Sequence, residues 1–440
     1  PRLPCRAMME ATRIRVLPDV LIDQIAAGEV VESPASVVKE LLENALDAGA
    51  RRIVVEFAGG GLERIRVIDD GEGMSAADAA LALKRHATSK IRGPQDLDRI
   101  DTMGFRGEAL PSIASVSRFV LVTRRPQDEV GTRVTTTPDG RVASAPIAAP
   151  AGTTVTVDDL FHNVPARRKF QKSERTLAAG IAETVGRAAL AFPGMHLVLA
   201  AEGRKPVAYL PCARLADRVP QVFGRDVADR LHPVHASRDG ITVSGVVGDP
   251  SLARADASRL VLLVNRRPVQ DPALRRAVLT GYSVLVPQGR FPVAVLSVEL
   301  PPGDVDVNVH PRKTEVRFAR PREVAAALFS AVQDAVVGTP WLAQAGLEAP
   351  IGTAVPHDPH HAGDGAPPAP DRWPPAAEAP TLRNPALGEI QQGLFGDAPA
   401  AGMRMADLRY VGQVGRTVLV CEGRDTLVLV DQHAAHERVN

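Results

Sequence analysis

The stretch that decides the fold is residues 25–50, IAAGEVVESPASVVKELLENALDAGA. Within it, Ser33 followed by Pro34 predicts the start of a helix, because serine is a good N-cap and proline suits the first helical position. Gly49 predicts where this helix ends. The apolar side chains gather on one half of the helix, which is expected to face a core: Val37, Val38, Leu41, Leu42, Ala45 and Leu46.

A polar stripe runs along the same predicted helix. Glu40, Asn44 and Asp47 stand at positions i, i+4 and i+7, which lie near one another on a helix. A solvated face gives the same pattern as one wall of a ligand site. The glycine loops that follow in the chain favour the ligand site.

Two glycine loops come after this helix. The first, DDGEG at 69–73, follows a predicted strand, and the carboxylate of Asp69 could accept a hydrogen bond from an exocyclic amine, although most such sequences are only turns. The second, GFRGE at 104–108, precedes an apolar helix and suits a phosphate group. Between them, the polar residues 85–90, RHATSK, could form a lid. The chain has no GxxxxGK[ST] pattern, so a P-loop enzyme is excluded.

Helical and strand patterns alternate through the first 337 residues and predict a mixed α/β fold. A turn through Gly59-Gly60-Gly61 is expected to join the first two strands. The strands are expected at 52–57, 64–69, 116–123, 132–137, 153–157, 241–247, 260–264 and 293–300, and the further helices at 76–86, 175–190 and 322–337.

The composition changes after residue 337. Proline, alanine and glycine dominate, as in GDGAPPAPDRWPPAAEAP at 363–380, and such a segment is expected to be a disordered linker because it buries too little apolar surface. From Tyr410 onward the pattern predicts two strands and the start of a helix. We therefore expect the chain to be truncated within a further domain, and its natural start to be Met8 or Met9.

Bulk composition limits the classes of protein. The formal net charge of the 440 residues is +1, so any basic surface must be local. The three cysteines, Cys5, Cys212 and Cys421, are far apart and show neither zinc-ligand spacing nor a disulfide framework. No apolar run reaches the roughly 20 residues that span a bilayer. These features favour a reduced cytoplasmic compartment and no membrane partner.

Several strings together resemble the GHKL ATPase superfamily and, within it, the MutL family. They are residues 25–50, RHATSKI at 85–91, GFRGEAL at 104–110, GTT at 152–154 and VDVNVHPRKTEVRF at 305–318. The resemblance implies an α+β sandwich, with a GHKL-type ATPase domain at 9–214 and a smaller α/β transducer domain at 215–337. A disordered linker at 338–405 and a C-terminal dimerisation or endonuclease fragment at 406–440 complete the expected organisation.

The resemblance also implies a role for each matching residue. Glu40 would be the general base that activates water, Asn44 would hold Mg²⁺, and Asp69 would bind the adenine amine with Thr153 nearby. Lys313, from the transducer domain, would reach the γ-phosphate of ATP. The other residues implied to bind the nucleotide are Gly71 and Gly73 at the adenine, Thr88, Ser89 and Lys90 in the lid, and Arg106 and Gly107 in the phosphate loop. This chain departs from many relatives in having Asp70 beside Asp69, which is expected to have little effect because Asp70 can face solvent.

Two basic clusters are candidate DNA contacts, although surface charge alone would explain either. Arg266 and Arg267 follow a predicted strand, and the residue that matches Arg267 contacts DNA in MutL-like proteins. Arg167, Arg168, Lys169 and Lys172 form the second cluster. Contacts to backbone phosphates would give binding without sequence preference.

The last residues resemble the start of the endonuclease motif of nicking MutL proteins. Asp431, His433 and Glu437 could share a metal ion such as Mn²⁺ or Zn²⁺, although the rest of the family motif lies beyond Asn440. This chain is therefore not expected to nick DNA, whereas the full-length protein could.

The function that the resemblance implies is DNA mismatch repair, through an ATP-operated clamp that hydrolyses ATP slowly. Its expected partners are DNA, a second copy in an ATP-dependent homodimer, a MutS-type mismatch recognition protein and a sliding clamp or helicase. Two alternatives are the ATPase half of a type II topoisomerase, against which VDVNVHPRK at 305–313 argues, and a nucleotide-gated scaffold without significant hydrolysis.

Overall fold

The computed structural model divides the chain into two units, 1–354 and 355–440, each of which is described by itself. The residues that it describes are 27–28, 30–90, 103–104, 107–136, 141–306, 316–337, 409–414, 418–422 and 427–431. The predicted linker and the predicted helix after Asp431 lie outside these ranges.

Helix α2 (Pro34–Asp47) begins where the sequence predicts. Ser33 has an extended backbone and accepts a hydrogen bond from the Ser36 N–H, while the Ser36 hydroxyl accepts one from the Ser33 N–H, so the first turn is capped from both sides. The helix ends two residues before Gly49, whose φ of +69° favours glycine. Its apolar half is buried, which leaves the polar stripe free to form part of a site.

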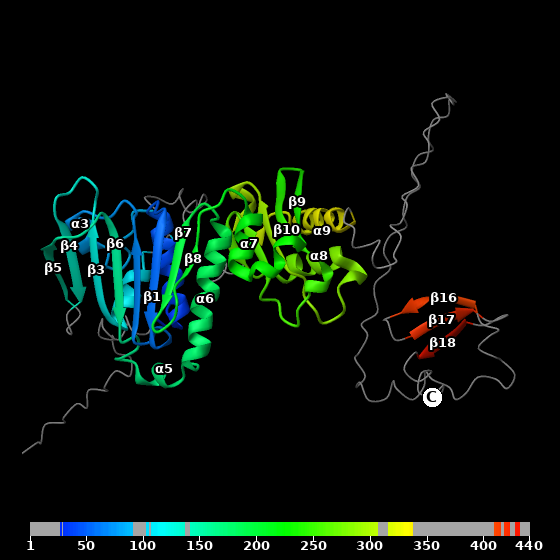
Figure 1. Ribbon diagram of the computed structural model, residues 1–440, viewed down its shortest axis with the longest axis horizontal. Coiled ribbons are helices and arrows are strands. Elements are labelled where there is room, and N and C mark those ends of the chain that lie inside the picture. Colours follow the sequence, from blue (N-terminus) through cyan, green and yellow to red (C-terminus); the bar gives the residue numbers. More distant parts are fainter. Residues whose placement is uncertain are drawn as a thin grey trace, which may run out of the picture. The chain divides into compact units, whose positions relative to one another are not determined.

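An eight-stranded sheet forms the main layer of the first part of unit 1 (Figure 1). Its strand order is β5-β4-β3-β6-β2-β1-β7-β8, and every neighbouring pair is antiparallel except β1 with β7. The strands are β1 (Arg52–Ala58), β2 (Arg64–Asp69), β3 (Arg118–Arg124), β4 (Gly131–Thr136), β5 (Val142–Ile147), β6 (Gly152–Asp158), β7 (His196–Ala201) and β8 (Val207–Tyr209).

Helices cover one face of this sheet. Buried and less buried residues alternate along β1, β2 and β3, as expected of strands with one face on a core. The core on that face includes side chains of α2 and of α6 (Glu174–Ala191), together with those of the strands. Three short helices complete this part: α3 (Ala76–Leu81), α4 (Ala109–Ser115) and α5 (Pro165–Lys169). The α/β sandwich is therefore confirmed.

The turn between β1 and β2 shows why three glycines stand together. Gly59, Gly60 and Gly61 all have positive φ, and they form a 3₁₀ turn that fits under two helices. A Cβ on Gly60 would lie 2.9 Å from the Glu174 carbonyl oxygen, and one on Gly61 would lie 2.7 Å from Pro34 Cβ. The predicted turn is confirmed, and the glycines allow the helices to approach it.

The helix predicted at 76–86 is wrong in its second half. Helix α3 ends at Leu81, after which the Lys84 N–H donates to the Leu81 carbonyl in a tighter turn, and His86 adopts a φ of +61°. Only two of its apolar side chains, Ala79 and Leu83, are well buried, so little packing favours a longer helix.

A second, five-stranded sheet has the order β12-β11-β13-β10-β9. Figure 1 labels β9 and β10 of this sheet, beside α8 and α9. Helices α8 and α9 share one core with it, whereas residues of α6, α7 and the turn at Arg225–Arg230 share another, so all five residues of β11 are buried. The strands are β9 (Leu231–Arg238), β10 (Ile241–Gly248), β11 (Leu260–Val264), β12 (Arg267–Val269) and β13 (Ala294–Glu299), and the helices are α7 (Leu215–Phe223), α8 (Pro272–Tyr282) and α9 (Pro321–Val337). A short pair, β14 (Val305–Asp306) and β15 (Arg317–Phe318), precedes α9.

Unit 2 contains three antiparallel strands among its described residues, rather than the two predicted. They are β16 (Arg409–Val414), β17 (Val418–Glu422) and β18 (Leu427–Asp431). In β16 the pairing with β17 shifts by one residue between Tyr410 and Gly412, so the simple alternation that marks a strand is interrupted there.

Candidate functional site

A row of three polar side chains crosses neighbouring strands of the large sheet. Asp69 ends β2 and is paired with Thr153 on β6, which is paired with Thr123 on β3. The hydroxyls of Thr123 and Thr153 lie 3.0 Å apart, and Thr123 is only 1% exposed. Strand register therefore brings together residues that are 84 positions apart in sequence, from 69 to 153.

The Asp69 carboxyl is held in a partly buried position. Burial is the largest influence and raises its pKa to about 6, against hydrogen bonds from the Gly71 and Thr153 backbones that lower it. Asp70 also raises this pKa, as the smallest of the four causes. The Asp70 side chain is exposed and accepts hydrogen bonds from the Arg51 and Arg52 N–H groups at 2.7 and 2.8 Å. The small effect predicted for Asp70 is confirmed.

The loop after β2 fits between α2 and β3. A Cβ on Gly71 would lie 2.9 Å from the Ala48 carbonyl oxygen, at the end of α2. Gly73 has a φ of +67°, and a Cβ there would collide with the Arg124 carbonyl. The next residue, Met74, donates its N–H to the Thr123 hydroxyl at 2.9 Å. Both glycines are therefore required for a close approach of backbone segments, which sets Asp69 beside the end of α2.

The polar stripe of α2 carries a second cluster. The Lys90 ammonium donates to Asn44 Oδ1 at 3.0 Å and to Asp47 Oδ2 at 2.5 Å. The Asp47 carboxylate also accepts the N–H groups of Met103 at 2.8 Å and of Gly104 at 3.0 Å. Asp47 thereby joins two segments of chain to the helix, a role that the sequence did not assign to it.

The predicted lid and phosphate loop meet near this cluster. The Lys90 N–H donates to the Thr88 hydroxyl at 3.2 Å, while Thr88 and Ser89 are exposed. Gly107 has a φ of +65°, and a Cβ there would lie 2.6 Å from the Ala87 carbonyl oxygen. The two segments are therefore in contact, because Gly107 lies against Ala87 and Gly104 lies against Lys90.

The structure describes only some of the remaining residues that are candidates for nucleotide binding. Glu40 lies on α2, one turn before Asn44, and is half-buried. Arg106 and Lys313 lie outside the described residues. The amide oxygen of Asn44 already accepts a cation, Lys90, and oxygen ligands of this kind suit Mg²⁺, so the stripe fits a bound metal chemically.

Arg266 and Arg267 lie at the tight turn between β11 and β12. Asn265 and Arg266 both have positive φ, and this tight turn leaves Arg266 exposed but Arg267 only 8% exposed. Burial lowers the pKa of the Arg267 guanidinium, and the carboxylates of Glu43 and Asp47 on α2 oppose that shift. The Arg267 guanidinium thus lies near the acidic side of α2, and its contact with DNA stays a prediction.

The second basic cluster lies at α5 and the residues after it. Arg168, Lys169 and Lys172 are exposed, whereas Arg167 is half-buried. Phe170, between these cations, is 83% exposed. This surface combines accessible positive charge with an aromatic ring.

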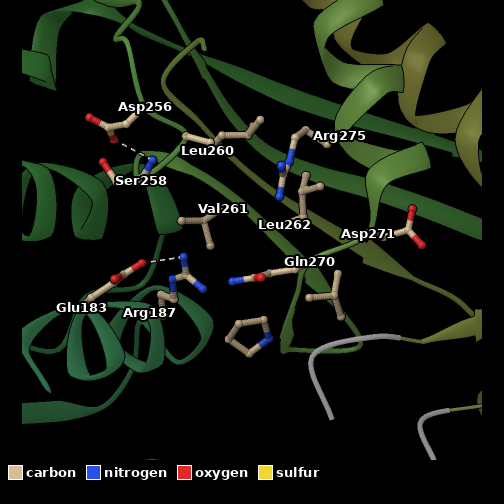
Figure 2. Close-up of a pocket in the computed structure, with 13 residues that line it drawn as sticks. Glu183, Arg187, Asp256, Ser258, Leu260, Val261, Leu262, Gln270, Asp271 and Arg275 are labelled. Atoms are coloured by element: carbon tan, nitrogen blue, oxygen red, sulfur yellow. Dashed lines mark hydrogen bonds and ion pairs between the residues drawn. The ribbon is translucent and has the colours of Figure 1, made fainter. Parts of the chain in front are cut away.

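A cavity of about 270 Å³ lies between α6 and the edge of the second sheet (Figure 2). Arg187, which pairs with Glu183 at 2.6 Å on α6, and Gln270 and Arg275 point into it. None of the residues assigned to nucleotide binding lines this cavity. The assignment of nucleotide-binding residues therefore depends on their polar contacts and not on this cavity.

The candidate metal site at the C-terminal end is not described. Asp431 ends β18, while His433 and Glu437 lie outside the described residues. Among the residues that the structure does describe, no group of three or more His, Cys, Asp or Glu side chains could hold a metal ion. Within the described part of the chain, no helix is long and apolar enough to cross a membrane.

Three family models match the chain. Residues 31–150 match the histidine kinase-, DNA gyrase B- and HSP90-like ATPase model, and residues 219–337 match the model described as DNA mismatch repair protein, C-terminal domain. Residues 411–440 match the MutL C terminal dimerisation domain.

Curated relatives extend the match over almost the whole chain. The DNA mismatch repair protein MutL of Anaeromyxobacter sp. strain K is 48% identical over 97% of this chain and 74% of its own length. The protein of the same name from Symbiobacterium thermophilum is 43% identical over 97% of this chain and 75% of its own length.

Solved structures give the same result for unit 1. The N-terminal domain of a DNA repair protein is 25% identical with a TM-score of 0.61, covering 72% of this chain and 97% of that domain. The ATPase domain of Aquifex aeolicus MutL, described as a bacterial mismatch repair endonuclease, is 28% identical with a TM-score of 0.51, covering 69% of this chain and 99% of that domain.

Proposed function

The chain belongs to the MutL family of DNA mismatch repair proteins and carries a GHKL-type ATPase domain, and from that premise we propose how its residues use ATP. The proposed site joins two groups of residues on the first sheet and α2. Asp69 and Thr153 hold the adenine, with the buried Thr123 supporting Thr153 from behind, whereas Glu40 and Asn44 act at the phosphates. The gyrase-type topoisomerase alternative is set aside by family membership.

One observation supports the adenine assignment most directly. The Asp69 carboxyl is partly buried beside a glycine loop and keeps its charge above a pH of about 6. A charged carboxylate accepts the hydrogen bond of an exocyclic amine, whereas a guanine at the same place would present a carbonyl oxygen and be repelled. Gly71 and Gly73 let the loop backbone approach the base closely.

The phosphate side supplies the catalytic groups. Bound Mg²⁺ would neutralise phosphate charge, and Asn44 would hold it through the amide oxygen that now contacts Lys90. Glu40 would accept the proton of the attacking water, and Lys90, Arg106, Gly107 and Lys313 would contact the phosphates. Because Lys313 belongs to the proposed transducer domain, ATP would link the two proposed domains, 9–214 and 215–337.

We infer that ATP binding shifts the chain toward a homodimer. Family membership and the match to a dimerisation domain at 411–440 support self-association. Light scattering at tens of micromolar protein, with and without a non-hydrolysable ATP analogue, tests this. The expected result is a rise in mass with the ATP analogue, and no rise with a non-hydrolysable GTP analogue used as the control. A parent chain that keeps a constant mass at saturating ATP analogue contradicts the proposal.

DNA binding is proposed for the exposed cations rather than for Arg267. Arg168 and Lys169 stand on a surface with Lys172 and the exposed Phe170, which suits contacts to a phosphate backbone. The double variant Arg168→Glu, Lys169→Glu should weaken binding equally across sequences and flatten its salt dependence. Arg204→Glu, Lys205→Glu, the same charge change on another exposed segment, is the control. Equal salt slopes for both variants would remove this cluster from the DNA surface.

The wider role follows the family. We propose that the chain works in the cytoplasm with a MutS-type mismatch recognition protein and a sliding clamp or helicase. Incision of DNA is proposed only for a full-length protein with Asp431, His433 and Glu437 completed by further metal ligands, Mn²⁺ or Zn²⁺ being the metal.

A further inference from the structure

The Lys90 ammonium occupies the oxygen at which the proposed function would place Mg²⁺. Its Nζ lies 3.0 Å from Asn44 Oδ1 and 2.5 Å from Asp47 Oδ2. The Lys90 side chain is 20% exposed and that of Asp47 is 8% exposed, so this ion pair is largely shielded from water. A shielded pair is weakened less by salt than one on the surface.

Asp47 holds Lys90 in place by fixing the surrounding backbone. Both of its carboxylate oxygens also accept main-chain N–H groups, from Met103 at 2.8 Å and from Gly104 at 3.0 Å. A Cβ on Gly104 would lie 3.2 Å from Lys90 Nζ and 3.8 Å from Asn44 Oδ1. Gly104 is thus fitted closely against the ammonium, which is unlike an incidental surface ion pair.

We propose that Asp47 and Lys90 form a latch in which the ammonium stands in for Mg²⁺ on Asn44 and must leave when Mg²⁺ arrives with ATP. This rests on the proposed function. Two cations cannot share one amide oxygen at contact distance without strong repulsion. A phosphate offers the released ammonium a new charged partner. Asp47 is a positioning residue, because it acts through Lys90.

The latch predicts a property that a mere stabilising ion pair would not have. If Lys90 competes with Mg²⁺ for Asn44, removing the ammonium must lower the Mg²⁺ concentration needed to support nucleotide binding. If Lys90 only binds phosphate, its removal weakens binding at every Mg²⁺ concentration and leaves the midpoint of the Mg²⁺ titration unchanged. The midpoint therefore separates the two.

The experiment measures equilibrium binding of a fluorescent, non-hydrolysable ATP analogue as Mg²⁺ is titrated. Lys90→Met should lower the half-saturating Mg²⁺ concentration about tenfold, which corresponds to about 1.4 kcal/mol. Lys84→Met is the matched control, because Lys84 is an exposed lysine six residues away with no described contact to the cluster. It should leave the midpoint at the parent value.

Asp47→Asn provides a second test that keeps the lysine. It removes the ion pair, while the amide oxygen can still accept one backbone N–H. The midpoint of the Mg²⁺ titration should therefore fall about threefold. The parent and the variant are compared at a temperature at which circular dichroism shows both to be folded. An unchanged midpoint in Lys90→Met, or one that rises, overturns the latch. A parent chain that binds no analogue at any Mg²⁺ concentration overturns the proposed function instead.

Discussion

The two sides of the candidate nucleotide site are built in different ways. On the adenine side, Asp69, Thr153 and Thr123 stand on three paired strands, whose register fixes their spacing. On the phosphate side, one helix supplies Asn44 and Asp47, and the groups that contact them come from segments 90 and 103–104. Backbone hydrogen bonds of the sheet therefore hold the adenine side, whereas side-chain contacts to loops hold the phosphate side.

This difference indicates which side is prepared in advance of the ligand. Strand hydrogen bonds cannot rearrange without breaking the sheet, so the adenine side should keep its shape. The contacts of Asp47 and Lys90 can be exchanged individually, so the phosphate side can respond to charge. In a site of this kind, the adenine binds to a surface of fixed shape, whereas the side-chain contacts on the phosphate side change when the phosphates bind.

The largest effect is expected on the phosphate side, from Glu40→Ala. Loss of the general base should reduce hydrolysis roughly 10²–10⁴-fold while analogue binding stays near the parent level. Steady-state phosphate release and equilibrium binding measure the two quantities. Glu43→Ala, on the same helix, should hydrolyse ATP at close to the parent rate. Parent-level turnover in Glu40→Ala would show that another group activates the water.

An intermediate effect is expected on the adenine side, from Asp69→Asn. The folded-state pKa of about 6 lies above the ordinary 3.8, so the folded protein holds the extra proton between these values and its stability falls as pH rises through this window. Above about pH 6 the ionised Asp69 lowers the free energy of unfolding by its full amount, at most about 3 kcal/mol. The uncharged side chain of Asp69→Asn does not carry this cost.

Asp69→Asn should therefore melt at a higher temperature than the parent at pH 7.5, and the difference should shrink near pH 4. The same variant should bind the ATP analogue more weakly, because it loses the charged acceptor, and parent affinity should decline as pH falls below 6. Scanning calorimetry and binding at both pH values measure this. Equal melting temperatures at pH 7.5 would show that the buried charge costs nothing.

The smallest effect is expected from Thr123→Val, which tests the rigidity of the adenine side. The Met74 N–H would lose its acceptor beside a buried residue, at a cost of roughly 1–3 kcal/mol. Thermal unfolding should show this loss, with analogue affinity falling severalfold. Thr132→Val, at the paired position on β4 and 7% exposed, is the control and should change stability less. If the two variants behave alike, the Thr123 hydroxyl has no special role.

The sequence predicted the parts of the site that are marked locally. A strand that ends in Asp69 and turns through Gly71 and Gly73 is visible in five consecutive residues. Thr123 could not be identified in this way, because its place beside Thr153 depends on pairing between β3 and β6. Most strands were predicted for the same reason as this loop, because the alternation of apolar and polar residues and the turn residues between strands are visible in short stretches of sequence.

Contacts between distant segments were the main omission. Asp47 and Lys90 are 43 positions apart, so the stripe on α2 showed that Asp47 was polar but not what it binds. The burial of Arg267 was missed for a related reason, because a basic dipeptide after a strand does not reveal which arginine the turn buries. Both depend on tertiary packing that residue patterns do not encode.

The apolar cluster shared by α6, α7 and the second sheet has a consequence for handling the protein. Leu190 and Ala191 at the end of α6 pack with Val219 of α7 and with the buried strands β11 and β13. A fragment cut after residue 214 would leave these side chains open to water, and apolar patches of this kind promote self-association. An expression fragment that continues through Val337 keeps the cluster covered, so the two sheets are best produced as one piece.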